Sequence, residues 1–290
     1  MILIAESGYT KCDWVFLNSD GSEHKRFSTM GFNPYFHSAT FIYEELSDND
    51  AFKAVGSTIE FVYFYGAGAS SESLKDIIKD GLQMVLPQAE VNVDHDLVAS
   101  AYSTYTGEPA ITCIIGTGSN SCFFDGETVS EEVPALAYVL GDEGSASFIG
   151  KRLVADFLYK KLPAEMAEDF YNTYQLDKDE IITSVYNKPN ANVYLASFSR
   201  FAGKHMEHPY VKKIVREGFE KFADIHIACF SNCELVPVHF VGSVGAIFHE
   251  ILEDVLTERN MKLGQIMRKP VDGLIKYHLE YLKVLEAYKV

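Results

Sequence analysis

The chain has 290 residues, of which 47% are hydrophobic and 23% charged, a balance typical of globular proteins with one large or two modest domains. Its formal net charge of −16 argues against nucleic-acid binding, because an acidic surface repels phosphate backbones. Met1 leads straight into a strand-like stretch instead of a basic and apolar leader, and no apolar run approaches the ~20 residues that span a bilayer. We therefore expect no membrane contact and a cytoplasmic location.

The first half of the chain alternates predicted strands and helices. Apolar runs on either side of an Asp20-Gly21 turn signal predict a three-strand meander over Ile2–Glu6, Cys12–Leu17 and Glu23–Ser28. Helical and strand patterns then alternate. We expect helices over about 36–46, over about 72–84 and from residue 97, and strands over 61–65 and 90–93.

The pattern begins again near Gly107. A strand at Ala110–Ile115, a polar glycine turn, a strand at Cys122–Phe124 and an Asp125-Gly126 turn signal repeat the order of the opening residues. Such duplication indicates two related lobes with a cleft between them. The rest is predicted to be mostly helical, over about 144–161, 164–174, 189–205, 209–231, 245–256 and 273–288, with one strand at 236–241.

The five cysteines show no metal-type pairing. Cys229 and Cys233 are four residues apart and would share a helix face, which could form half of a metal site. Without a second pair, buried thiols are the favoured interpretation.

Two glycine-bearing turns are candidates for phosphate binding. Residues Glu6–Asp13 place small residues between two strands, and Thr10 and Lys11 add a hydroxyl and a cation that suit a terminal phosphate. The spacing is not that of a P-loop, and an ordinary polar hairpin explains this segment equally well. Residues Gly116–Ser121 carry more hydrogen-bonding side chains than a turn requires, which favours a binding loop.

Three further segments combine acidic residues or glycines with an element boundary. Asp94-His95-Asp96 ends a strand and opens a helix, so an aspartate could cap the helix or act as a general base, and local sequence favours the cap. Acids between glycines at Leu140–Ser147 favour recognition of sugar hydroxyls, although Asp142 or Ser145 could simply cap a helix. Gly242–Gly245 permits close approach of a ring or phosphate, and tight packing explains it nearly as well.

In this order the motifs resemble the actin/hexokinase/heat-shock-cognate superfamily. Within it, the chain resembles the N-acetylglucosamine kinase branch, which is related to the BadF/BadG/BcrA/BcrD ATPases. The most specific matches are Gly31–Pro34, Asp96 with the following Leu-Val-Ala-Ser-Ala, Gly116–Asn120, Leu140–Ser145 and Pro270–Leu274 with Tyr277-His278. The resemblance implies an α/β, actin-like (ribonuclease H-like) fold of duplicated domains with a cleft between two lobes. The expected lobes are 1–108, joined by a C-terminal helix at about 273–290, and 109–272, which carries helical insertions.

The resemblance also implies an ATP-dependent sugar kinase that phosphorylates N-acetylglucosamine or a related N-acetylhexosamine. Asp96 would be the catalytic base, Mg²⁺ would bridge the phosphates, and Glu6 would hold the metal through water. The first phosphate hairpin would be Ser7–Lys11 and the second Thr117–Ser119. The implied ATP contacts are Ser7, Gly8, Thr10, Lys11, Thr117, Gly242, Ser243 and Val244. The implied sugar contacts are Asn33, Gly118, Ser119, Asn120 and Asp142. The expected partners are small molecules, and a homodimer is compatible with the family.

Three positions depart from the family's pattern: Glu6 replaces an aspartate, Tyr9 replaces a small residue and Ala137 replaces a glycine. They leave open a non-catalytic sugar or nucleotide sensor on the same fold. A third interpretation is an ATPase that drives a partner protein, like the reductase-activating relatives that carry an iron–sulfur cluster between subunits. Cys113 and Cys122 fall within predicted strands, a poor position for such a cluster.

Overall fold

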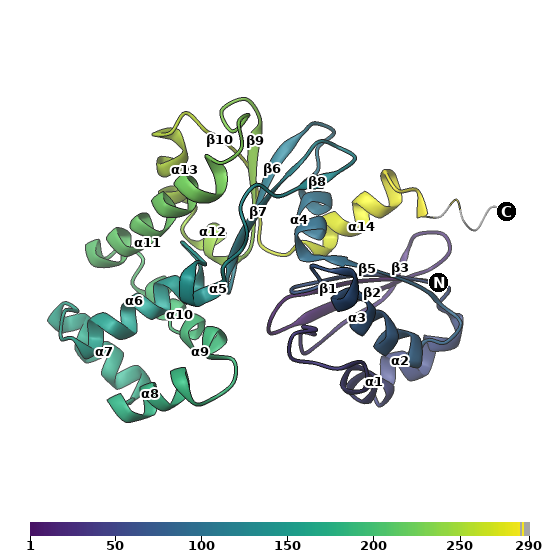
Figure 1. Ribbon diagram of the computed structural model, residues 1–290, viewed down its shortest axis with the longest axis horizontal. Helices are drawn as coiled ribbons and strands as arrows, with labels where there is room; N and C mark the ends of the chain where they lie inside the picture. Colours follow the sequence, from purple (N-terminus) through teal and green to yellow (C-terminus); the bar gives the residue numbers. More distant parts are fainter. Residues whose placement is uncertain (285, 287–290) are drawn as a thin grey trace. The chain divides into compact units, whose positions relative to one another are not determined.

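The computed structural model describes residues 1–284 and residue 286, which form two compact units (Figure 1). Unit 1 comprises residues 1–105 and the described residues from Pro270 onward, and unit 2 comprises residues 106–269. Each unit contains one five-stranded sheet. None of the helices within the described residues has the length and apolar character that a bilayer crossing requires.

The sheet of unit 1, sheet A, has the strand order β3-β2-β1-β4-β5. Its strands are β1 (Ile2–Ser7), β2 (Cys12–Leu17), β3 (Glu23–Thr29), β4 (Phe61–Gly66) and β5 (Glu90–His95). The first three strands form an antiparallel meander, whereas β4 runs parallel to β1 and β5 runs parallel to β4. The carboxyl ends of β1, β4 and β5 therefore meet at one edge of the sheet.

Helices cover both faces of sheet A. They are α1 (Ala39–Ser47), α2 (Asp50–Val55), a 3₁₀ turn (Gly56–Thr58), α3 (Glu72–Val85), α4 (Asp96–Thr104) and α14 (Val271–Glu280). Side chains alternate along a strand, so Leu3 and Ala5 of β1 share a core cluster with residues of α1 and α3. Ile2 and Ile4 share the opposite cluster with residues of α4 and α14. Two-sided burial explains why β1 reads as a continuous apolar run.

The sheet of unit 2, sheet B, has the strand order β10-β9-β6-β7-β8. Its strands are β6 (Ala110–Ile115), β7 (Ser119–Phe124), β8 (Val129–Ser130), β9 (Pro237–Val241) and β10 (Lys262–Met267). Strands β6, β7 and β8 form an antiparallel meander, β9 is parallel to β6, and β10 is parallel to β9. Counted from β1 and from β6, the two sheets have the same order and directions. The duplication predicted from the repeated pattern is thus confirmed.

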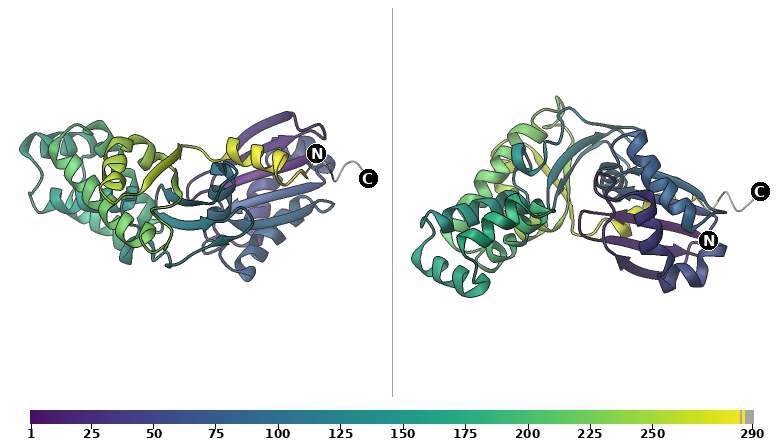
Figure 2. Two further views of the ribbon diagram at one scale, coloured as in Figure 1. Left: turned by 90° about the horizontal axis from the view of Figure 1, so that it is seen from above. Right: turned by 60° about the horizontal axis from the view of Figure 1, so that its bottom comes forward.

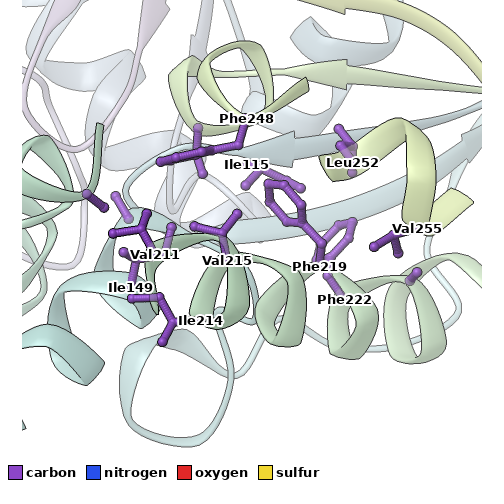
Figure 3. Packing of buried hydrophobic residues seen from close by; sticks show 14 of the residues in the cluster. Ile115, Ile149, Val211, Ile214, Val215, Phe219, Phe222, Phe248, Leu252 and Val255 are labelled. Carbon is purple, nitrogen blue, oxygen red and sulfur yellow. The ribbon is translucent and has the colours of Figure 1, made fainter. Parts of the chain in front are cut away.

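Unit 2 carries most of the helices. They are α5 (Ala137–Leu140), α6 (Ala146–Leu158), α7 (Ala164–Tyr174), α8 (Lys178–Tyr186), α9 (Ala191–Ser197), α10 (Ser199–Lys204), α11 (Pro209–Phe222), a π-helix (Ala223–Ile227), α12 (Ser243–Ile247) and α13 (His249–Thr257). Helices α6 to α11 gather on one side of sheet B (Figures 1 and 2). The core of unit 2 joins Phe219 and Phe222 of α11 to Leu252 and Val255 of α13 and to Ile115 of β6 (Figure 3).

Several element boundaries differ from the predictions. The helix predicted over 189–205 is two helices, because the chain tightens at Phe198, whose N–H bonds to the carbonyl three residues back. The helix predicted over 209–231 passes into the π-helix after Phe222. Helices α2 and α8 and strand β10 were not predicted. Helix α14 ends at Glu280, and residues 285 and 287–290 of the C-terminal helix expected at about 273–290 lie outside the described residues.

Candidate functional site

The turn between β1 and β2 forms the first predicted phosphate hairpin. The N–H of Gly8 donates to the carbonyl of Lys11 at 2.9 Å and closes the turn. Thr10 and Lys11 are exposed, and the Lys11 ammonium lies 2.5 Å from the Asp13 carboxylate. The ring of Tyr9 is 38% exposed, so it adds bulk to the surface of the loop without filling its interior.

Ser7, the last residue of β1, connects this hairpin to the segment around Phe32 through its side chain. Its Oγ accepts a hydrogen bond from Phe32 N at 2.8 Å and donates to Phe32 O at 3.2 Å. The hydroxyl is therefore used within the protein, and Ser7 fixes the segment Gly31–Asn33 against the end of β1. Because the hydroxyl is already bonded, the predicted contact between Ser7 and ATP would have to be made by backbone atoms of Ser7.

Asn33 is the most notable polar group of this segment, because its side chain is buried and incompletely bonded. The residue is 2% exposed, and its Oδ1 accepts from Tyr35 N at 3.0 Å. Its Nδ2 is buried with no hydrogen-bond partner among the described residues. An unmet buried donor costs about 1–3 kcal/mol, which a ligand oxygen would recover.

Glu6 lies near the carboxyl end of β1, and Asp96 is the first residue of α4 after β5. Burial raises the pKa of Glu6 to about 8, and the negative charges of Asp96 and Asp13 act in the same direction, against the Lys11 ammonium. Burial and these neighbouring charges therefore oppose the ionisation of Glu6. The carboxylates at this edge of sheet A are close enough to repel one another.

Asp96 and Asp94 have different surroundings. Asp94 Oδ1 lies 3.1 Å from the Lys75 ammonium and accepts from His95 N at 2.9 Å. Asp96 Oδ1 lies 3.2 Å from His95 Nε2, whereas its Oδ2 has no ion pair or hydrogen bond within the described part of the chain. The side chain of His95, the N-cap residue of α4, makes no capping bond, and Asp96 is already helical. The capping role that local sequence favoured for the aspartate is therefore wrong.

A divalent cation is compatible with these carboxylates, because it would favour the ionised form of Glu6 against Asp13 and Asp96. No three His, Cys, Asp or Glu side chains converge to hold a metal directly in residues 1–284 and 286.

In unit 2, the second predicted hairpin is bonded to the acidic loop Gly141–Gly144. Ser119 N donates to Asp142 Oδ1 at 3.1 Å. A Cβ on Gly118 would stand 2.7 Å from the same oxygen, so only glycine leaves room for the carboxylate. Asp142 has a left-handed backbone with a φ of 57°, and burial raises its pKa. Strained polar residues of this kind are frequent at ligand sites.

The start of α6 joins the two loops. Ala146 N donates to Gly116 O at 2.9 Å, and Ser147 N donates to Thr117 O at 3.1 Å. Ser145 caps the helix by accepting from Phe148 N at 3.2 Å, as the sequence allowed. The hairpin and the acidic loop therefore form one bonded assembly.

Asn120, a predicted sugar contact, has protein partners for both ends of its amide. Its Nδ2 donates to Glu131 at 3.3 Å, and its Oδ1 accepts from Ser121 N at 2.8 Å. A ligand would have to share these groups.

The last glycine turn supports the packing interpretation. Gly242 has a φ of 126°, and a Cβ there would stand 2.3 Å from the carbonyl oxygen of Ile115. Ser243 is exposed, but the Val244 side chain is buried in the core of unit 2. Of the three predicted adenosine contacts, Val244 could therefore act only through its backbone.

His226 was not among the predicted site residues. Its Nε2 lies 3.4 Å from Glu143 Oε2 in the acidic loop. The two residues are 83 positions apart, and no local pattern in the sequence links them.

All five cysteines are free thiols. Cys12, Cys113 and Cys122 are buried in strands. Cys229 and Cys233, for which buried thiols were the favoured interpretation, are only half-buried.

No protein-family model matches the sequence, and no curated protein matches it. Solved structures do. A protein described as a candidate N-acetylglucosamine kinase from Porphyromonas gingivalis is 35% identical, with a TM-score of 0.92 over 97% of this chain and 100% of that chain. A second candidate N-acetylglucosamine kinase, from Chromobacterium violaceum, has a TM-score of 0.73 at 15% identity over 95% of this chain and 98% of its own.

A ROK family glucokinase from Streptomyces griseus, solved with glucose and AMPPNP, has a TM-score of 0.53 at 14% identity over 95% of this chain and 97% of its own. At such identities the last two likenesses concern the fold alone. Together with the matching sheets, the comparisons confirm the predicted actin-like α/β fold.

Proposed function

Since the chain belongs to the family of N-acetylglucosamine kinase-like proteins, we propose that it transfers the γ-phosphoryl group of ATP to an amino sugar. The proposed substrate is N-acetylglucosamine or a closely related N-acetylhexosamine. The observation that carries the proposal is the setting of Asp96, at the carboxyl end of β5 with Oδ1 3.2 Å from His95 Nε2 and Oδ2 unpartnered among the described residues.

Asp96 Oδ2 is the proposed base. It accepts the proton of the attacking sugar hydroxyl, whose oxygen forms a bond to the γ-phosphorus while the bond to the β-phosphate oxygen breaks and ADP leaves. His95 Nε2 lies 3.2 Å from the other carboxylate oxygen, Oδ1. Asp94 is a poor candidate for this role, because Lys75 already occupies its carboxylate.

The two hairpins are the proposed phosphate contacts. In unit 1, Thr10 and Lys11 of the hairpin are exposed, and their hydroxyl and ammonium groups suit phosphate oxygens. In unit 2, Thr117 and Gly118 play the corresponding role. Mg²⁺, held through water by Glu6, would supply neutralisation of the phosphate oxygens. Gly242 and Ser243 are the proposed adenosine contacts.

The proposed sugar contacts are of two chemical kinds. Asn33 Nδ2 offers a buried donor to a sugar oxygen. Asp142 offers a carboxylate that accepts from sugar hydroxyls, and Ser119 and Gly118 shape its surroundings.

The test is a kinase assay with purified protein, Mg-ATP and a panel of N-acetylglucosamine, N-acetylmannosamine, glucosamine and glucose, with ADP release as the readout. We expect an N-acetylhexosamine to stimulate ADP release most. If no sugar stimulates it, the proposal is wrong. A sugar that raises the melting temperature without turnover would instead indicate a non-catalytic sensor.

A further inference from the structure

The π-helix Ala223–Ile227 places a buried histidine against the loop that carries Asp142. His226 is 3% exposed, and its Nε2 lies 3.4 Å from Glu143 Oε2. Because a carboxylate can only accept, Nε2 carries the proton of this bond. The other ring nitrogen, Nδ1, is buried and has no hydrogen-bond partner among the described residues.

The contact is part of a closed network. Ser119 and Ser121 are two residues apart on β7, so their side chains point to the same face of the strand. Ser119 Oγ donates to Glu143 O at 2.8 Å, and Ser121 Oγ donates to His226 O at 2.6 Å. The bond between Glu143 and His226 closes the triangle. Strand β7, the acidic loop and the π-helix therefore hold one another in place.

Core packing alone does not require this histidine. Its ring stacks on Phe222, with centroids 5.0 Å apart and planes 22° from parallel, a contact that a phenylalanine would also make. Burial lowers the pKa of His226, so the ring stays neutral at physiological pH. A buried ring nitrogen without a partner costs about 1–3 kcal/mol. Single π-turns within helices recur at functional sites.

We propose that His226 is a positioning residue for sugar binding. Its Nε2–H holds Glu143, and through Glu143 it holds the backbone that sets Asp142 in its left-handed conformation. This inference rests on the proposed function, because it takes Asp142 as the group that accepts from the sugar hydroxyls. Asp142 needs such support, since a non-glycine residue keeps a left-handed backbone only where its surroundings fix it.

His226→Phe tests the proposal, because it removes the donor and keeps a ring on Phe222. We expect the sugar KM to rise roughly tenfold, the loss of one hydrogen bond to a charged group, with the ATP KM within about twofold and kcat within about threefold. His226→Gln, which retains an N–H donor at a similar reach, should recover most of the sugar affinity. His249→Phe is the matched control, because His249 is exposed and lies outside this network.

The rise in melting temperature on addition of N-acetylglucosamine is the second readout, because it reports binding without turnover. A smaller rise for His226→Phe than for the wild type supports the proposal. An unchanged sugar KM and an unchanged rise overturn it. If His226→Phe does not fold, Glu143→Ala carries the same test, and wild-type sugar affinity in that variant overturns the proposal. A wild type that binds sugar but releases no ADP refutes the proposed function, while the binding comparison still decides the role of His226.

Discussion

Gly31 lies so close to the first hairpin that a Cβ atom on it would stand 2.1 Å from the carbonyl oxygen of Gly8 and 2.9 Å from the amide nitrogen of Lys11. No side chain can occupy that space without moving the turn. The hydrogen bonds between Ser7 and Phe32 fix the same segment to the end of β1. The shape of the proposed phosphate loop therefore depends on a residue that no nucleotide would touch.

Gly31→Ala should consequently displace the loop Gly8–Lys11 and weaken nucleotide binding. We expect the ATP KM to rise at least about tenfold, with a loss of roughly 1–3 kcal/mol in the free energy of unfolding from overpacking. The measurements are ATP kinetics and denaturant unfolding. Gly203→Ala on α10 is the control, because a Cβ there would have its nearest neighbour outside the helix 4.0 Å away, at Ile247. An unchanged ATP KM in Gly31→Ala would show that nucleotide binding does not depend on the space that Gly31 leaves for the loop.

Asp96→Asn should lower kcat by roughly 10²–10⁴-fold, because the amide cannot take the proton of the attacking hydroxyl. Both KM values should change little, since asparagine is nearly isosteric with aspartate. Asp94→Asn, two residues earlier, removes a carboxylate that pairs with Lys75 and should leave kcat close to that of the wild type. If kcat fell equally in Asp96→Asn and Asp94→Asn, the role of Asp96 would be structural and not catalytic.

Ala137 occupies a left-handed conformation with a φ of 55° at the start of α5. The Cβ of an L-residue is strained in that region, and glycine is not. Ala137→Gly should therefore raise the free energy of unfolding by about 1 kcal/mol. Chemical denaturation measures the change. Ala135→Gly, at an exposed position without a positive φ, should give no gain, and an equal gain there would refute the conformational explanation.

His278 makes the stability of unit 1 sensitive to acid. It is fully buried on α14, its Nδ1 donates to Leu274 O at 2.8 Å, and its Nε2 accepts from the Tyr65 hydroxyl at 3.1 Å. Tyrosine rings of Tyr63 and Tyr102 also contact it. Burial lowers the pKa of His278 from 6.5 to about 4, against the smaller effect of the Leu274 carbonyl.

The folded state thus resists a proton that the unfolded chain accepts below pH 6.5. The contribution of His278 to stability is constant above that pH and falls as the pH drops toward 4. Between pH 7.5 and 5 the loss should be about 2 kcal/mol. Unfolding of His278→Gln, which cannot titrate, should show a correspondingly smaller loss over this interval. His24→Gln, at an exposed position, should keep the wild-type pH dependence. Identical pH dependence in His278→Gln and the wild type would show that another group is responsible.

Much of the fold follows from local signals in the sequence. Turn dipeptides and apolar runs locate both meanders, and their repetition predicts two like sheets. Strand β10 gives no such signal, because Gly264 interrupts it and its pairing with β9 shifts register after Leu263. A Cβ on Gly264 would stand 2.2 Å from the His239 ring, so the glycine reflects a tertiary contact. Helix α2 has only six residues, too few to show a helical repeat of apolar positions in the sequence.

Some residues of the candidate site can likewise be found from the sequence, and others only from the structure. Motif order and the family resemblance bring Glu6, Asp96 and Asp142 forward, because acidic residues beside glycines or at a strand end are visible in the sequence. The use of the Ser7 hydroxyl is not visible, since its partner Phe32 is 25 residues away. The family resemblance implies an adenosine contact at Val244, and only packing shows that its side chain is buried. His226 could not be found for the same reason.

Unit 1 is built from two stretches of chain that the whole of unit 2 separates. On the ribosome, unit 2 therefore emerges complete while sheet A still lacks α14. Until that helix arrives, the apolar side chains Ile2, Ile4, Val15 and Leu17 miss the cover that Leu274 provides. The nascent chain thus presents an incompletely covered hydrophobic face until α14 is made, a state that invites chaperone binding.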